Sequence, residues 1–148
     1  MTSRNIRNYK APTRSKSHFD TFVVEPNFTL EFPAMTWTGG CLCGAVRFEV
    51  QGPPDQVGIC HCRRCQRWTG SAFAVGVRFP RAAFRLTKGD PRLYRSSTIM
   101  ERGFCADCGS PLIEYVNTEN DVDGVWLSLG NFDDPSAFDP RHLSLIHI

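Results

Sequence analysis

Seven cysteines fall into three tight groups along this chain of 148 residues. A C-x-C pair comes first, a C-x-C-x-x-C run follows, and a C-x-x-C pair comes last; these groups are Cys41–Cys43, Cys60–Cys65 and Cys105–Cys108. Thiolates at such spacings can reach one soft metal ion together without long loops. Thiolate ligands select Zn²⁺, Cu(I) or iron–sulfur clusters, and zinc is the metal that we expect here.

A disulfide framework is the rival explanation of these cysteines. Seven is an odd number, so one thiol would be left over. The N-terminus, Met1–Arg7, leads into no apolar run typical of a secretory signal. We therefore expect a cytoplasmic protein, and in a reducing cytoplasm such cysteine patterns indicate metal sites or catalysis rather than disulfides.

Length and composition are ordinary for a globular domain. The chain is long enough for one domain with a real core, and 41% of its residues are hydrophobic and 22% charged. The formal net charge of +2 is too small to argue for a nucleic-acid partner. No stretch is long and apolar enough to cross a membrane. The oligomeric state stays open.

The first 36 residues differ from the rest, because basic residues are dispersed there among Ser, Thr and Asn without periodicity. We expect 1–36 to be a disordered basic extension, since it offers too little apolar surface to fold alone. A nucleic-acid-binding arm is the less favoured alternative, because the charges form no block. The segment also fits upstream sequence translated from a wrong start, with Met35 as the true start. Part of Phe19–Phe28 could pack as an edge strand.

From Gly39 onward the pattern is that of β-strands. Val46, Phe48 and Val50 alternate with charged residues, as in a half-buried strand. Proline and glycine every few residues leave little room for long helices, and one short helical turn is expected around Cys62–Trp68. We predict a mainly β protein. Its expected strands are 46–50, 73–79 (ended by Pro80), 84–86, 93–95, 112–116 and 125–129.

The seven thiols divide naturally into four and three. A zinc ion with four thiolates is coordinatively complete and structural, whereas one with three keeps an open position. The C-x-C and C-x-x-C pairs could close a tetrahedron if the fold brings them together, and the middle run could hold a second ion from one loop. Other partitions are possible, because the sequence does not say which groups meet in space.

Four segments resemble, in order and with suitable gaps, the motifs of the glutathione-dependent formaldehyde-activating enzyme family, which is related to centromere protein V. The segments are Gly39–Phe48, Cys60–Phe73, Phe104–Leu112 and Gly130–Pro135. The resemblance covers about residues 37–142, the expected zinc domain. It implies a β-tent fold, in which small twisted antiparallel sheets are pinned by zinc. It also implies a structural zinc at Cys41, Cys43, Cys105 and Cys108, and a second, catalytic-type site at Cys60, Cys62 and Cys65.

The resemblance implies a carbon–sulfur lyase that forms or cleaves S-(hydroxymethyl)glutathione, with glutathione or a similar thiol as its partner. An open position beside three thiolates could accept the sulfur of such a thiol. Arg63, Arg64 and Arg67 could bind its carboxylates, because guanidinium matches carboxylate geometry; alternatively they form a solvated surface cluster. His61, between two expected ligands, is expected to point away from the metal. Asp133 and Asp134, followed by Pro135, fit a turn better than catalysis.

Two alternatives to the enzyme remain. The chain could be a non-catalytic zinc module that binds a partner, or a redox sensor whose three-cysteine site releases metal on oxidation. The origin of the C-terminal end, 143–148, has two explanations. Its residues read equally as a translated sequencing adaptor or as a truncated natural end.

Overall fold

The structure is a computed structural model that describes residues 35–118, 123–140 and 142–144. The predicted extension before Met35 and the last four residues lie outside this range, so the predictions made for them stay predictions. Among the described residues, the elements in chain order are β1 (Thr36–Gly40), β2 (Arg47–Gln51), β3 (Gln56–Cys60), α1 (Arg63–Thr69), β4 (Ala74–Pro80), η1 (Arg81–Ala83), β5 (Phe84–Lys88), β6 (Arg92–Arg95), β7 (Met100–Phe104), β8 (Pro111–Val116), β9 (Gly124–Ser128), η2 (Leu129–Asn131), η3 (Pro135–Ala137) and β10 (His142–Ser144).

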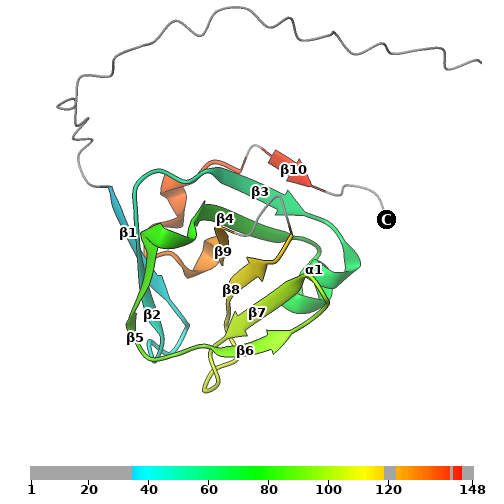
Figure 1. Cartoon of the computed structure of the whole chain (residues 1–148), viewed down its shortest axis with the longest axis horizontal. Helices are drawn as coiled ribbons and strands as arrows, with labels where there is room; N and C mark the ends of the chain where they lie inside the picture. Colours follow the sequence, from blue (N-terminus) through cyan, green and yellow to red (C-terminus); the bar gives the residue numbers. More distant parts are fainter. Residues whose placement is uncertain (1–34, 119–122, 141, 145–148) are drawn as a thin grey trace, which may run out of the picture. The chain divides into compact units, whose positions relative to one another are not determined.

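Within the described residues the strands form two sheets (Figure 1). One has the order β1-β2-β5, and the other has the order β10-β3-β4-β9-β8-β7-β6. All pairings are antiparallel except that of β10 with β3. The mainly β fold with little helix is the one predicted. No helix in the described part of the chain is long and apolar enough to span a membrane.

The alternating pattern of β2 explains how the smaller sheet meets the core. Phe48 and Val50 are buried, whereas Arg47 and Glu49, which alternate with them, are partly exposed. The Phe48 ring meets Phe132 edge to face, with the ring centroids 5.3 Å apart. The smaller sheet and the larger one therefore share a single apolar cluster, to which β4, β8 and β9 of the larger sheet contribute buried Val77, Phe79, Leu112, Ile113, Val125 and Leu127.

The two faces of the larger sheet differ in chemistry. Val77 pairs with Leu127, and Leu127 pairs with Ile113, and all three side chains are buried in the core. Successive side chains of a strand point to opposite faces, so Trp126 and its partner Glu114 lie on the other face. That second face carries the pocket described below.

The strands predicted at 46–50, 112–116 and 125–129 correspond to β2, β8 and β9, and Pro80 ends β4 as expected. The strand predicted at 73–79 corresponds to β4, which begins one residue later, because Phe73 precedes it and is 43% exposed. The turn at Lys88–Pro91 joins β5 of one sheet to β6 of the other, so it does not close a hairpin. The sequence analysis missed β1, β3, β7 and β10. Each of the first three contains a glycine that weakens the alternation, and β10 has only three residues.

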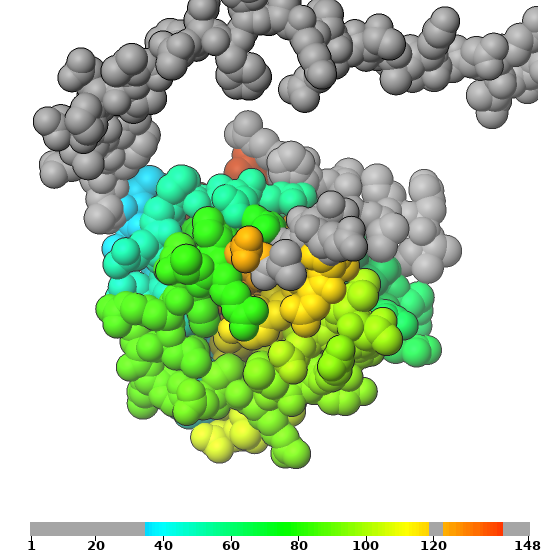
Figure 2. Space-filling model, in the orientation of Figure 1, coloured from blue at the N-terminus to red at the C-terminus, as the bar shows by residue number. Residues whose placement is uncertain are grey.

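The edge strand β6 is solvent-exposed along its whole length. Figure 2 shows the surface of the molecule in the same orientation as Figure 1, coloured by residue number. At the opposite end of the same sheet, β3 leads directly into the short helix α1. The first and last strands, β1 and β10, extend slightly beyond the predicted domain limits of 37 and 142.

Candidate functional site

The first and last cysteine groups meet in space. Cys41 and Cys43 lie in the turn between β1 and β2, and Cys105 and Cys108 lie in the turn between β7 and β8. The Sγ atoms of this four-sulfur group all lie within 4.8 Å of one another. Cys43 Sγ lies 3.5 Å from Cys41 Sγ and 3.7 Å from Cys105 Sγ. A tetrahedral zinc with bonds of about 2.3 Å needs sulfurs about 3.8 Å apart, so the four residues fit that ion.

The two turns are built alike and belong to different sheets. In each, the N–H of the first cysteine, Cys41 or Cys105, donates to the carbonyl five residues later at 3.0 Å. Gly44 and Gly109 follow the second cysteine with φ angles of 72° and 76°. Glycine adopts this left-handed conformation without the steric cost that a Cβ brings. The two glycines therefore permit these tight turns, and a metal held here would join the two sheets.

The thiols of the four-sulfur group do not ionise equally on their own. Hydrogen bonds from the Ser110 hydroxyl, 3.2 Å from the sulfur, and from the Ser110 backbone N–H lower the pKa of Cys108 to about 6. The Ala45 N–H favours the thiolate of Cys43, but the neighbouring thiols, Cys41 first among them, raise the pKa of Cys43 to about 12. A bound cation would remove this mutual repulsion and allow all four sulfurs to ionise.

The middle cysteines form a separate three-sulfur group. Cys60 ends β3, Cys62 is the N-cap of α1, and Cys65 lies in its first turn. Their Sγ atoms also lie within 4.8 Å of one another. The Cys65 N–H donates to Cys62 Sγ at 3.3 Å, and it lowers the pKa of Cys62 against the opposing effect of burial. Burial, followed by the neighbouring Cys62, raises the pKa of Cys65.

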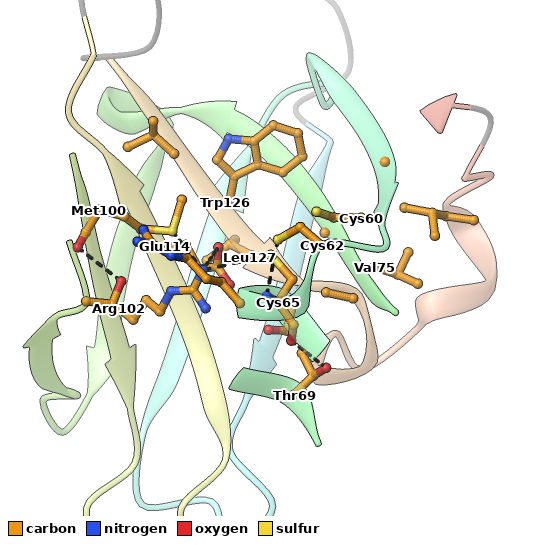
Figure 3. Close-up of a pocket in the computed structure, with 18 of the residues that line it drawn as sticks. Cys60, Cys62, Cys65, Thr69, Val75, Met100, Arg102, Glu114, Trp126 and Leu127 are labelled. Carbon is orange, nitrogen blue, oxygen red and sulfur yellow. Dashed lines mark hydrogen bonds and ion pairs between the residues drawn. The ribbon is translucent and has the colours of Figure 1, made fainter. Parts of the chain in front are cut away.

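The three-sulfur group forms part of the wall of a cavity of about 470 Å³. Strands β3, β4, β7, β8 and β9, the start of α1 and the residues just after β6 supply its other walls. Figure 3 shows the cysteines among the side chains that line it, with Met100 and Arg102 from β7 and Trp126 from β9. The cavity therefore lies on the face of the larger sheet that is opposite the core, and three sulfurs face a space large enough for a small molecule.

A buried ion pair lies beside these sulfurs. Arg102, on β7, is only 3% exposed, and it pairs across the strands with Glu114 on β8. Its Nη2 atom lies 3.8 Å from Glu114 Oε2 and 3.8 Å from Cys65 Sγ. The guanidinium also lies over the Trp68 ring, 5.4 Å from its centroid. Burial raises the pKa of Glu114, and Arg102 opposes that rise.

The sequence analysis missed Arg102 and Glu114. Arg102 stands three residues before Cys105, and Glu114 is the charged member of an otherwise apolar strand, Leu112–Val116. An outward-facing charge on a half-buried strand gives the same pattern, so the signal was present but ambiguous. The pairing of β7 with β8 is what makes the two residues partners.

The three predicted arginines are not equivalent. Arg64 is exposed and lines the cavity. Arg63 donates from Nη1 to Gln66 Oε1 at 2.5 Å, and neither Arg63 nor Arg67 is among the described residues that line the cavity. Only one member of the predicted cluster is therefore placed to meet a molecule in the pocket.

The structure also defines the positions of four other residues. The His61 ring lies 5.4 Å from the Phe73 ring and is not among the described lining residues. Asp133 binds Arg47, and Asp134 accepts the Ser136 N–H at 3.1 Å to cap η3, so this pair is structural as expected. Trp126 lines the cavity rather than the core.

Comparisons with known proteins agree with this fold. A model of the glutathione-dependent formaldehyde-activating enzyme family matches residues 36–147. An uncharacterized lyase of Schizosaccharomyces pombe is 29% identical over 96 residues, which make up 64% of this chain and 69% of that protein. The crystal structure of a Rhodobacter sphaeroides protein superposes with a TM-score of 0.57 at 21% identity, covering 72% of this chain and 99% of that one. The last comparison concerns the fold alone.

Proposed function

The chain belongs to the glutathione-dependent formaldehyde-activating enzyme family, and from that premise we propose that it is a zinc-dependent carbon–sulfur lyase. Its substrates are hemithioacetals, the adducts of an aldehyde with glutathione or a similar thiol. The yeast relative that bears the name of a lyase supports the reaction class. The predicted cytoplasmic location stays a prediction.

One observation carries the proposal, namely that the incomplete set of sulfurs faces the cavity. Cys60, Cys62 and Cys65 line the pocket, whereas none of the cysteines of the four-sulfur group is among the described residues that line it. Three thiolates leave one tetrahedral position for another ligand. We assign the four-sulfur group to a structural ion and the three-sulfur group to the ion of the active site.

The reaction needs a place for a thiolate and a place for a proton. In the cleavage direction, the carbon–sulfur bond breaks with its electron pair moving to sulfur, the hydroxyl loses its proton, and a carbonyl group forms. A zinc ion held by the three sulfurs would stabilise the substrate thiolate, because its positive charge favours the ionised form of sulfur.

The chain's own residues complete the site. Arg102 places a buried positive charge 3.8 Å from Cys65 Sγ, which offsets part of the negative charge of three thiolates. Arg64, exposed at the cavity, is the residue that we assign to a carboxylate of the thiol.

The test is exchange NMR of glutathione with formaldehyde and with a larger aldehyde, with and without zinc-loaded protein. We expect adduct formation and breakdown to exceed the spontaneous rates, and we expect this gain to be lost in Cys62→Ser. As a control, the variant must fold and still bind one zinc ion. This result would show that only the metal site of the three-sulfur group was removed. A folded protein with both sites filled that accelerates no adduct would reject the enzyme and leave the non-catalytic zinc module.

A further inference from the structure

The walls of the cavity beyond the three-sulfur group are mostly apolar. Ile59, Val75, Met100, Val116 and Trp126 contribute to them from β3, β4, β7, β8 and β9. Formaldehyde has no substituent other than hydrogen on its carbonyl carbon. A water molecule takes up about 30 Å³ in the liquid, so an aldehyde of two heavy atoms would fill only a small part of about 470 Å³.

The cavity offers few partners for a charged occupant. Arg64, Arg102 and Glu114 are the charged residues among the described lining residues. Arg102 is already engaged by Glu114 and by Cys65 Sγ, each 3.8 Å from its Nη2 atom, so the two charges have partners within the protein. Arg64 is exposed. The charged ends of glutathione are therefore best matched at Arg64 and in solvent, and the apolar wall is left for the other half of the adduct.

Small residues keep the floor of the cavity open. Gly58 on β3 pairs with Gly76 on β4, and Gly76 pairs with Ser128 on β9, so the three form one row across the sheet. All three line the cavity. A Cβ on Gly76 would lie 3.1 Å from Cε3 of Trp126, which is tighter than ordinary contact. Glycine at this position preserves space against the Trp126 ring.

We propose that this apolar space binds the carbonyl half of the adduct, and that the preferred aldehydes carry an apolar chain larger than the hydrogen atoms of formaldehyde. This inference rests on the proposed function and names its substrate class. The bonds that change are the same for every aldehyde of the series. The carbon–sulfur bond breaks toward sulfur, the hydroxyl proton is released and R–CHO leaves, with no change of oxidation state.

A series of glutathione adducts with one thiol and a growing aldehyde tests the inference. Formaldehyde, acetaldehyde, propanal and butanal are compared by kcat/KM for breakdown, each corrected for its spontaneous rate. Burial of one methylene corresponds to about a fourfold gain, so we expect kcat/KM to rise about fourfold with each added carbon. A flat series, or one in which formaldehyde is fastest, overturns this inference and leaves the proposed lyase intact. If no adduct of the series is accelerated, the proposed function fails and the inference with it.

A second readout does not depend on turnover. S-methylglutathione and S-butylglutathione are inert analogues of small and large adducts, and calorimetry gives their dissociation constants with the zinc-loaded protein. We expect S-butylglutathione to bind at least tenfold more tightly. Equal affinities contradict an apolar subsite, whatever the catalytic rates are.

Two substitutions place the subsite on the sheet. Gly76→Ala adds a methyl group against Trp126, so the ratio of butanal to formaldehyde activity should fall at least fivefold. Val116→Phe narrows the same cavity from β8 and should act in the same direction if Gly76→Ala fails to fold. The matched control is Gly130→Ala, where an added Cβ has no atom within 4 Å and lies outside this cavity. A ratio unchanged in a folded Gly76→Ala or Val116→Phe protein would remove the apolar wall from the substrate site.

Discussion

The Nη2 atom of Arg102 lies 3.8 Å from Sγ of Cys65, in the interior of the protein. The same atom lies 3.8 Å from Glu114 Oε2, so one guanidinium joins the three-sulfur group on α1 to the carboxylate on β8. Both charges are largely shielded from bulk water, because Arg102 is 3% exposed and the side chain of Glu114 is 18% exposed. The three-sulfur group and the stability of the sheet are therefore coupled through one side chain.

Arg102→Met should destabilise the zinc-loaded protein by about 3 kcal/mol, because it leaves Glu114 buried without its cation. Most of this loss should disappear in the double variant with Glu114→Gln, which removes the unpaired charge. Urea unfolding of the four proteins gives the coupling free energy. If the two single effects simply add, the ion pair does not operate as a unit.

Cys41→Ser and Cys62→Ser should have opposite consequences for folding. The four-sulfur group spans turns of both sheets, and structural zinc binding supplies on the order of 10 kcal/mol in small zinc domains, so Cys41→Ser should unfold the domain. Cys62→Ser should remain folded and bind one zinc ion fewer. Circular dichroism and metal analysis of both variants check this. A soluble Cys41→Ser protein with an unchanged melting temperature would contradict the structural role of that group.

The sequence predicted well what depends on local spacing. Cys41 and Cys43 share one turn, as do Cys105 and Cys108, and each turn closes with a glycine, so both metal loops could be recognised before any fold was known. The alternation at Phe48 and Val50 likewise identified β2. Such patterns extend over a few residues and are dictated by backbone geometry.

What depends on pairing between distant strands could not be predicted. Arg102 and Glu114 become partners only because β7 pairs with β8 in one register, and a shift of one residue would place Glu114 in the core. In the sequence, Gly76 is only a residue that weakens a strand. That it leaves space for the Trp126 ring becomes clear only when β9 is placed beside β4. Among the three arginines near Cys65, only the fold distinguishes Arg64 as a cavity residue.

Asp133→Asn should cost about 1 kcal/mol of stability at low salt, the scale of an exposed ion pair. Hydrogen bonds from Arg47 and then Thr38 lower the pKa of Asp133, so the carboxylate is fully ionised at neutral pH. This pair holds the segment after η2 to the smaller sheet. At about 1 M salt the Debye length falls to about 3 Å, so the cost should shrink, as thermal unfolding at two salt concentrations would show.

Asp134→Asn is the control for that comparison. Asp134 accepts hydrogen bonds from the Ser136 N–H and hydroxyl as the cap of η3, and these contacts are not ion pairs. Its substitution should therefore have an effect that salt does not change. An equal salt response in the two variants would show that charge at Asp133 is not what holds the segment.

Arg64→Ala should raise KM for glutathione adducts about tenfold and change kcat little, because a charge-assisted hydrogen bond contributes about 1.5 kcal/mol and the carboxylate lies far from the bond that breaks. Arg67→Ala, the neighbouring arginine that is not among the described lining residues, should leave KM unchanged. Adducts of 2-mercaptoethanol, which has no carboxylate, separate charge recognition from a general disturbance of α1. Steady-state kinetics of both variants with the adducts of both thiols measure these changes in KM and kcat. If Arg64→Ala weakens both adducts equally, Arg64 shapes the pocket and does not bind the carboxylate.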